Sequence, residues 1–416
     1  MNDELDVAIL GAGPSGSIAA ALLQKKGFKI RVFEREQFPR FSIGESLLPQ
    51  TMEILDEAGL LRCVVEAGFQ YKNGAAFCRG ENEAAFDFRL KSNPAWGIAY
   101  QVVRADFDKV LIDAVAAKGV PVHYQHEITS LVTDRKGAVL QIKHPGGNLE
   151  VKARFVLDAT GFGRLLPRLL NLEVPSEFPT RMALFTHIED GIPSGSKTLG
   201  SKTLDRQKIL VTVHPTNKAI WYWLIPFSNG RCSIGVVAEP HLLEHVNGDE
   251  RSKLMALVAE ASTLNVLLKH AIWDTPVRSL HGYAANVNSL HGPSFGLLGN
   301  AGEFLDPVFS SGVTIAMQSA RLIVPLVDKH LSGDVVDWPN EYDIPLRLGI
   351  NAFRTFVDSW YRGAFQDIIF KKDQQPAIKE MICSILAGYA WDRSNPYVTD
   401  PKRLKVLEEI CAPSNS

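Results

Sequence analysis

The sequence predicts an α/β fold, in which a parallel-sheet domain is combined with a β-rich insert and a helical C-terminal region. Three observations support this prediction. Apolar runs end in glycine turns at three widely separated places, residues 7–16, 155–161 and 295–302. The segment from about 172 to 280 is rich in strand-forming residues instead. After residue 341 the apolar residues recur at helical spacing.

The first glycine turn has the pattern of a dinucleotide-binding βαβ unit. An apolar strand leads into Gly11, Gly13 and Gly16, and an Ala-rich helix follows. Gly11 permits the tight turn, Gly13 lets a pyrophosphate approach bare backbone, and Gly16 lets the helix pack closely on the strand. A second apolar strand ends at Glu34, whose carboxylate can accept a hydrogen bond from a ribose hydroxyl. This fingerprint predicts a Rossmann-like domain and leaves NAD and FAD both open.

The elements that follow alternate between helical and strand periodicity. Their predicted order is a helix over 49–67, paired strands over 73–90, a helix from Arg104 to Gly119, a strand over 120–124, a meander over 131–155 and, after the third glycine turn, a helix over 310–326. The nucleotide-binding domain is therefore expected to be discontinuous. Its predicted parts are 1–171 and 281–340, with a β-rich substrate-side domain over 172–280 and a C-terminal helical region over 341–416.

Composition excludes several classes of protein. The chain has 416 residues, 46% of them hydrophobic, and a formal net charge of −2, so it can bury a large core and has no basic field for nucleic acid. No apolar run reaches membrane-spanning length, and the acidic N-terminus resembles no targeting peptide. Small-molecule chemistry in the cytoplasm is therefore expected, with no nucleic-acid partner and no membrane span.

No metal site is expected. The five cysteines are scattered without a CxxC pair. The stretch from His241 to His245 formally matches the HxxEH zinc pattern, but it follows Pro240 in the β-rich insert and no third ligand is indicated.

Three glycine turns are more than an NAD domain needs, and they suit a longer cofactor. In this arrangement the chain resembles, over nearly its whole length, the FAD-dependent monooxygenase superfamily of the hydroxybenzoate-hydroxylase type. The resemblance implies FAD as the cofactor, with Gly11, Gly13, Gly16 and Glu34 at its ADP end. It further implies that Arg104 contacts the cofactor and that Asp158 and Gly161 shape the wall near the nucleotide. Asp306 would touch the ribityl and pyrophosphate region, and the backbone of 307–312 would face the isoalloxazine.

Two shorter stretches indicate a branch of this superfamily. One is the WYWLIP run of residues 221–226, and the other is GESLLP at 44–49 followed by GFQYKNG at 68–74. Both resemble flavin-dependent halogenases, whose WxWxIP signature is matched at every fixed position and whose active-site lysine would fall on Lys72. In length the chain resembles the compact phenol- and pyrrole-directed group of this tryptophan-halogenase-like branch more than the longer tryptophan-processing enzymes.

The Trp pair and the lysine also have a physical interpretation. Trp221 and Trp223 project to the same face of a strand. If that face covers the flavin, an organic substrate cannot reach a flavin hydroperoxide, whereas a halide ion can. Lys72 in an apolar setting can donate a hydrogen bond to hypohalous acid or, with a lowered pKa, attack it to form a haloamine, and both modes stay open. The loop 306–314 resembles the halide-side loop of the family, which implies an anion site at Ser310, Ser311 and Gly312.

The resemblance implies a complete reaction. Reduced FAD would come from a separate flavin reductase, and O2 with chloride or bromide would yield hypohalous acid by way of the flavin hydroperoxide. The acceptor would be an electron-rich aromatic such as a phenol or pyrrole, free or tethered to an acyl or peptidyl carrier protein. Antibiotic or pigment biosynthesis in secondary metabolism is the expected setting.

Other interpretations stay open. The chain could be an FAD-dependent hydroxylase or an isoprenoid-type alkene reductase of the same superfamily, with Lys72 and the Trp pair in structural roles. It could also be a non-catalytic FAD-binding or carrier-docking subunit. Trp360 and Phe365 are candidates for the substrate pocket, although core packing explains most of the C-terminal aromatic residues.

Overall fold

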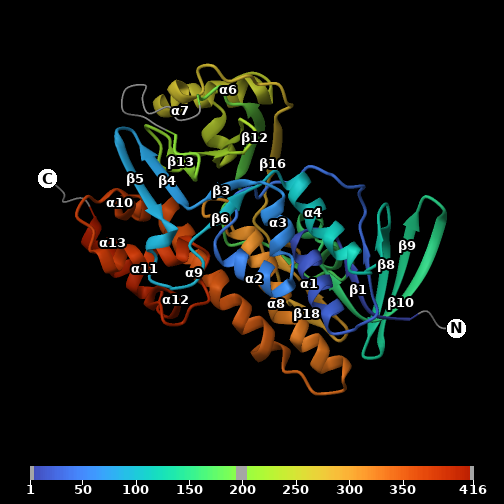
Figure 1. Cartoon of the computed structure of the whole chain (residues 1–416). Coiled ribbons are helices and arrows are strands. Elements are labelled where there is room, and N and C mark those ends of the chain that lie inside the picture. Colours follow the sequence, from blue (N-terminus) through green and yellow to red (C-terminus); the bar gives the residue numbers. More distant parts are fainter. Residues whose placement is uncertain (1–3, 194–203, 413–416) are drawn as a thin grey trace.

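A largely parallel sheet lies at the centre of the computed structural model, which describes residues 4–193 and 204–412 (Figure 1). The strand order is β18-β19-β10-β1-β2-β7, and β9 and β8 continue from β10 as an antiparallel extension. The bounds are β1 Leu5–Leu10, β2 Ile30–Phe33, β7 Val122–His123, β8 Glu127–Asp134, β9 Gly137–His144, β10 Gly147–Asp158, β18 His291–Gly292 and β19 Phe295–Leu297.

The three strands that lead into glycine turns are neighbours in this sheet. β10 pairs in parallel with β1 on one side and with β19 on the other. Leu10 lies opposite Asp158, and Asp158 lies opposite Leu297, so the three strands end at the same level. Their turns therefore meet at one edge, which confirms the Rossmann-like fold predicted from the sequence.

Helices cover the faces of this sheet because its central strands are apolar on both sides. α1 packs against α8, and α4 and α2 also pack against α1 (Figure 1). Their bounds are α1 Pro14–Lys25, α2 Gln50–Ala58, α3 Leu61–Glu66, α4 Arg104–Ala117 and α8 Ser311–Leu331. The single helix predicted over 49–67 is corrected to two, because Gly59 takes a left-handed conformation, with φ of 68°, and ends α2.

A second sheet has the strand order β16-β12-β15-β14-β13-β4-β5, and helices α6 and α7 lie above it in Figure 1. The bounds are β4 Gly74–Arg79, β5 Asn82–Asp87, β12 Met182–Glu189, β13 Lys208–Val213, β14 Trp221–Pro226, β15 Arg231–Ala238, β16 Arg278–His281, α6 Glu250–Glu260 and α7 Ser262–Leu267. β14 is buried on both faces. Tyr222 packs in the cluster beneath α6, whereas Trp221 and Trp223 face the main core.

The predicted boundary at residue 172 needs a correction. β4 and β5 come from the first 171 residues, yet β4 pairs in parallel with β13, where Gly74 lies opposite Lys208. The sheet on the substrate side therefore includes residues 74–87. Alternating apolar residues predict a strand but do not specify its partner strand, so this pairing could not be derived from the pattern.

The C-terminal region is helical, as predicted. α9 packs on α8, and α10 packs on both α9 and α13. The bounds are η5 Pro339–Asp343, α9 Ile344–Tyr361, α10 Ala364–Phe370, α11 Pro376–Leu386, α12 Pro396–Thr399 and α13 Lys402–Cys411. Shorter elements are β3 Gln70–Lys72, η1 Phe88–Leu90, β6 Ala99–Gln101, η2 Gly161–Gly163, α5 Leu165–Leu169, β11 Glu173–Val174, η3 Pro240–Leu243, β17 Asn286–Val287 and η4 Gly299–Ala301. Within the described residues, no helix has the length and apolar character to span a membrane.

The first glycine turn generates a stability prediction. A Cβ atom at Gly16 would lie 2.0 Å from the carbonyl oxygen of Gly11, whereas a Cβ at Gly13 would meet its nearest atom at 3.6 Å. We expect Gly16→Ala to lower the free energy of unfolding by about 1–3 kcal/mol through overpacking. Gly13→Ala, the matched control, should unfold like the parent. Denaturant unfolding without cofactor measures both, and equal midpoints for the two variants would contradict the close packing described here.

Candidate active site

A cavity of about 520 Å3 lies where the three glycine turns meet. Gly11, Gly161 and Asn300 contribute one wall, and Trp221 and Trp223 from the second sheet contribute another. Ligands of open α/β sheets bind at the carboxyl ends of the strands, and cavities of about 300–1,000 Å3 are usual for small molecules and cofactors. The cavity therefore has the place and the size of a cofactor site.

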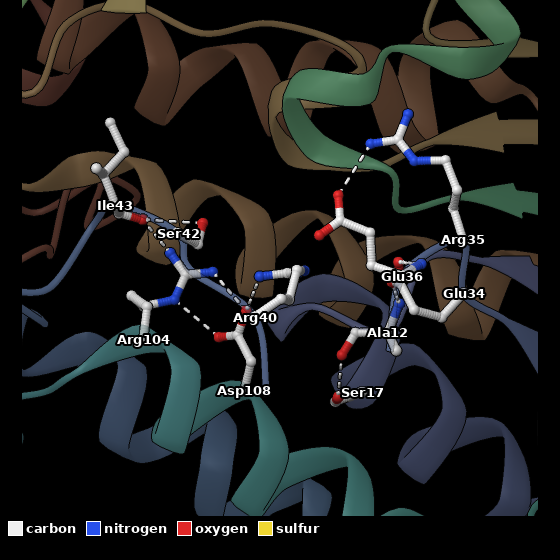
Figure 2. Close-up of polar contacts among 10 residues, drawn as sticks. All are labelled: Ala12, Ser17, Glu34, Arg35, Glu36, Arg40, Ser42, Ile43, Arg104 and Asp108. Atoms are coloured by element: carbon white, nitrogen blue, oxygen red, sulfur yellow. Dashed lines mark hydrogen bonds and ion pairs between the residues drawn. The ribbon is translucent and has the colours of Figure 1, made fainter. Parts of the chain in front are cut away.

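Glu34 lies in the cavity wall with its carboxylate held by backbone. One oxygen accepts a hydrogen bond from the N–H of Ala12 at 2.9 Å, and the other accepts from the N–H of Glu36 at 2.9 Å (Figure 2). The side chain is 7% exposed. The carboxylate keeps further lone pairs that could accept from a ribose hydroxyl, and this contact stays a prediction.

Two arginines share one buried carboxylate beside the first glycine turn (Figure 2). Arg104 donates from Nε and Nη2 to the two oxygens of Asp108, at 2.7 and 3.0 Å, and Arg40 donates to the same carboxylate at 3.1 Å. Both arginines line the cavity. Two arginines and one carboxylate leave a net positive charge at this place, which suits the binding of a pyrophosphate. Arg104 was predicted, whereas Arg40 was missed because it lies in an otherwise ordinary polar turn.

The first glycine turn leaves its backbone open to a ligand. Gly11 has a φ of 99°. Gly13 is the N-cap residue of α1 and has no side chain that could occupy the first N–H groups of the helix. Both line the cavity, so free N–H groups at the start of α1 can meet a phosphate. Gly16 does not line the cavity, and its role is the close packing of α1 on the turn.

Asp158 shapes the second turn from behind. It is fully buried and accepts hydrogen bonds from the N–H and the hydroxyl of Thr160, at 2.9 and 2.6 Å, and from the N–H of Leu166 at 2.7 Å. Thr160 and Gly161 line the cavity, whereas Asp158 does not. Burial raises the pKa of this carboxyl group. Asp158 therefore organises the wall without facing a ligand in the cavity.

The structure places Asn300, and not Asp306, at the third turn of the cavity. Asp306 is 0% exposed and does not line the cavity. It accepts hydrogen bonds from the Tyr361 hydroxyl at 2.9 Å and from the N–H of Val308 at 3.0 Å. Burial raises its pKa to about 6. The predicted contact of Asp306 with the ribityl region is therefore corrected.

Asn300 is the residue that the sequence analysis missed at this turn. It lines the cavity, and its buried Oδ1 atom has no hydrogen-bond partner among the described residues. An orphaned acceptor, the bare backbone of Gly13 and the Arg40–Arg104 pair together fit an extended cofactor with hydroxyl and pyrophosphate groups. The donor and acceptor set of the cavity is therefore compatible with FAD.

The two tryptophans form a fixed aromatic wall. Their ring centroids are 6.0 Å apart, and both side chains line the cavity. Trp221 donates from Nε1 to the hydroxyl of Tyr361 at 2.9 Å, and Trp223 donates to Ser233 at 3.0 Å. Because Tyr361 in turn donates to Asp306, a chain of hydrogen bonds joins the Trp wall to the loop that precedes α8.

The N-terminus of α8 faces the cavity through part of the predicted halide loop. Ser310 and Gly312 line the cavity, whereas Ser311 is buried and does not. Ser310 adopts a left-handed conformation, with φ of 56°, and gives the helix no side-chain cap. The N–H of Ser310 donates to the carbonyl oxygen of Pro307 at 3.0 Å. The N–H groups of the first turn of a helix, however, have no partner within the helix, and with the helix dipole they make this end of α8 suited to an anion.

Lys72 lies behind the cavity wall. It ends β3, is 0% exposed and does not line the cavity. Its Nζ atom donates to Ser46 Oγ at 2.7 Å and to the carbonyl oxygen of Leu47 at 2.8 Å, and it lies 5.3 Å from the centre of the Phe88 ring. Burial lowers the pKa of Lys72 to about 7. The surface position that is usual for a lysine is therefore excluded.

Trp360 and Phe365 pack in the core and do not reach the cofactor cavity. Both are fully buried, and neither lines the cavity. Each packs edge-on against Phe309, and Phe365 also packs against Phe356. Both therefore pack in the core around Phe309, and their role in a substrate pocket stays a prediction.

Glu45 and His245 lie in contacts that hold other parts of the chain. Glu45, which lines the cavity, bonds His187 Nε2 at 2.5 Å, and this contact joins the GESLLP segment to β12. His245 of the HxxEH stretch is exposed and bonds Glu260. No group of three metal-ligating side chains occurs in the parts of the chain that the structure describes.

Comparison with known proteins gives one family. The model of the FAD binding domain matches residues 4–233, more than half of the chain. The 1H-pyrrole-2-carbonyl-[peptidyl-carrier protein] chlorinase of Pseudomonas fluorescens is 28% identical over 98% of this chain and 92% of its own length. The corresponding brominase of Pseudoalteromonas luteoviolacea is 27% identical over 93% of this chain and 92% of its own length.

A solved structure is more similar still. The flavoprotein/dehydrogenase of Cytophaga hutchinsonii is 40% identical, with a TM-score of 0.93 over 98% of this chain and 99% of the other. The FAD cofactor predicted from the three glycine turns and the similarity to flavin-dependent halogenases are thus both confirmed. The chain belongs to the FAD binding domain family of flavoproteins, and it is an FAD-dependent enzyme similar to the flavin-dependent halogenases.

Proposed function

We propose that the protein halogenates an electron-rich aromatic ring with chloride or bromide, and that Lys72 delivers the hypohalous acid. One observation carries this proposal. A fully buried lysine lies one hydrogen bond behind a flavin-sized cavity, and the cavity has a wall of two indoles. Neither hydride transfer nor direct hydroxylation requires a lysine in that position.

The cofactor contacts follow from the cavity wall. We propose that Gly11, Gly13 and Glu34 hold the ADP end, that Arg40 and Arg104 bind the pyrophosphate, and that Asn300 bonds the ribityl chain. When bound, reduced FAD with O2 supplies the oxidising equivalents that convert a halide ion into hypohalous acid. Trp221 and Trp223 exclude an organic ring from this reaction, because their fixed side chains occupy the second-sheet side of the cavity.

The halide is proposed to bind at the start of α8. The backbone N–H groups of the first turn of α8, near Gly312, would attract an anion. A site of this kind distinguishes anions poorly by size, so chloride and bromide are both proposed as substrates. Ser311 contributes through its backbone alone, because its side chain is buried away from the cavity.

Lys72 suits the delivery of a halogen electrophile in either of two ways. With a pKa of about 7, its protonated and neutral forms both exist near neutral pH. The ammonium form donates a hydrogen bond to hypohalous acid. The neutral amine attacks the halogen, which forms an N–halogen bond and releases water from the hydroxide and the amine proton. The aromatic ring then takes the halogen as an electrophile.

The proposed substrate is a pyrrole or phenol, free or tethered to a carrier. The chlorinase and brominase relatives act on a pyrrole-2-carbonyl group carried on a peptidyl-carrier protein. We extend this substrate class to the present chain, and we assign the supply of reduced FAD to a separate flavin reductase in the cytoplasm. Antibiotic or pigment biosynthesis remains the proposed setting.

One observation favours a second candidate function. The solved structure that is 40% identical to this chain is named a flavoprotein/dehydrogenase. A dehydrogenase must bring its organic substrate into contact with the flavin, and the Trp wall opposes this contact. We therefore retain FAD-dependent dehydrogenation as the alternative, and the activity assay has to distinguish it from halogenation.

The activity assay supplies purified protein with FAD, a flavin reductase, NADH, O2 and bromide. Phenols, free pyrroles and pyrrole-2-carbonyl carrier protein are offered as acceptors, and products are identified by mass. We expect a brominated product whose formation depends on bromide and on the reductase. Oxygenation, alkene reduction or dehydrogenation without halogenated product would contradict the proposal.

Lys72→Met keeps the volume of the side chain and removes its amine. We expect FAD binding and oxygen consumption to persist, whereas halogenated product falls by about 100-fold or more, because the delivering group is lost. The matched control is Lys208→Met, since Lys208 is also largely buried but bonds Asn73 and Asp205 away from the cavity. Normal halogenation by Lys72→Met would refute the assignment of the lysine.

The pKa of Lys72 also predicts a pH dependence. The yield of halogenated product per O2 consumed should change with a midpoint near pH 7, because the amine titrates there. A yield that rises with pH identifies the neutral amine as the reacting form, and a yield that falls identifies the ammonium. The profile is measured in parallel for Lys72→Arg, which stays charged. A wild-type profile that is flat through neutral pH would contradict the role of this group.

A further inference from the structure

The link between the FAD cavity and Lys72 is a single side chain. Lys72 itself does not line the cavity, and neither does Leu47, its second hydrogen-bond acceptor. Ser46 lines the cavity and accepts a hydrogen bond from Lys72 Nζ at 2.7 Å. Among the residues that the structure describes, it is the one that has both properties. Within the described residues, Ser46 is therefore the hydrogen-bonded contact between the cavity and the lysine.

Backbone pairing holds Ser46 and Lys72 in a fixed relation. Strand β6 lies between them: it pairs with β3, where Ala99 faces Lys72, and it bonds the segment that contains Ser46 on its other side. The N–H of Leu47 donates to Tyr100 at 3.0 Å, and the N–H of Val102 donates to the carbonyl oxygen of Glu45 at 2.7 Å. These backbone hydrogen bonds hold the two segments that carry Ser46 and Lys72 on either side of β6, and so fix the distance over which their side chains meet.

Neighbouring side chains hold the same segment from the cavity side. Arg104 donates to the carbonyl oxygen of Ile43, and Glu45 bonds His187 of β12. Ser46 is 4% exposed, so its side chain is held within the packed wall. The hydroxyl oxygen is used as an acceptor by the lysine, which leaves the O–H hydrogen to be donated.

The geometry points to Ser46 as the positioning residue through which Lys72 acts on an oxidant in the cavity. Its hydroxyl oxygen holds the amine in place, and its O–H donates a hydrogen bond to hypohalous acid at the cavity wall. This inference rests on the proposed function, and it adds a second polar group to the route of the oxidant. Without Ser46 the amine keeps one acceptor, the carbonyl oxygen of Leu47, and loses its contact with the cavity.

The test uses three substitutions at Ser46 in the full-length protein loaded with FAD. Ser46→Ala removes the hydroxyl, Ser46→Cys keeps the volume with a weak acceptor, and Ser46→Thr keeps the hydroxyl. Oxygen consumption, halogenated aromatic product and free hypohalous acid, trapped by monochlorodimedone, are measured for each variant. The matched control is Ser294→Ala, because Ser294 is equally buried and bonds Gly137 at another edge of the parallel sheet.

We expect Ser46→Ala and Ser46→Cys to bind FAD and consume oxygen like the wild type. Product per O2 should fall by about tenfold, because a hydrogen bond to a charged group is lost, and trapped hypohalous acid should rise in its place. Ser46→Thr should recover most of the product, and Ser294→Ala should not change the ratio. A wild-type ratio in Ser46→Ala or Ser46→Cys, or a loss confined to FAD affinity, would overturn the inference.

A second measurement needs neither FAD nor halogenation. Denaturant unfolding of the cofactor-free protein is compared for Ser46→Ala, Lys72→Met and the double variant. If the two side chains interact as described, the shift of the double variant differs from the sum of the single shifts. Additive shifts would overturn the inference even if the wild type halogenates. If the shifts are non-additive but the wild-type protein makes no halogenated product, the proposed function is rejected and the Ser46–Lys72 interaction is retained.

Discussion

The common level at which β1, β10 and β19 end is the constraint on which the other features depend. Because these strands are parallel and in register, three turns that are about 150 residues apart in sequence reach the same edge of the sheet. Each turn then contributes a different kind of group. The first offers bare backbone and a fixed carboxylate, and the second a wall organised by Asp158. The third offers the amide oxygen of Asn300, which has no hydrogen-bond partner within residues 4–193 and 204–412.

The second sheet completes the cavity, and the segment around Ser46 separates the lysine from it. β14 buries Tyr222 in the hydrophobic cluster under α6 and directs its two tryptophans to the cavity. One face of this strand therefore packs in a core, and the other face lines the cofactor cavity. The hydrogen bonds from Trp221 to Tyr361 and from Tyr361 to Asp306 connect this wall to the loop before α8. Lys72 is then reached through Ser46, which lies on a segment bound to both β6 and β12.

Much of this architecture could be predicted from the sequence, because glycine turns, strand periodicity and the WxWxIP and GESLLP runs are local signals. The predictions that needed correction depend on tertiary pairing. β4 joins the second sheet through β13, and no local pattern contains that choice. Asp306 and Trp360 have the residue types of a site, yet both are buried behind it, whereas Arg40 and Asn300 line the cavity without a distinctive motif.

The central proposal is that a halide binds in the cavity at the start of α8, while Lys72 remains behind the cavity wall. A crystal structure of the FAD complex with bromide, recorded at the bromine absorption edge, measures this directly. The proposal predicts an anomalous peak in the cavity, at the backbone N–H groups of the first turn of α8 near Gly312. An empty start of α8 at saturating bromide, or a Lys72 side chain in direct contact with the flavin ring, would contradict it.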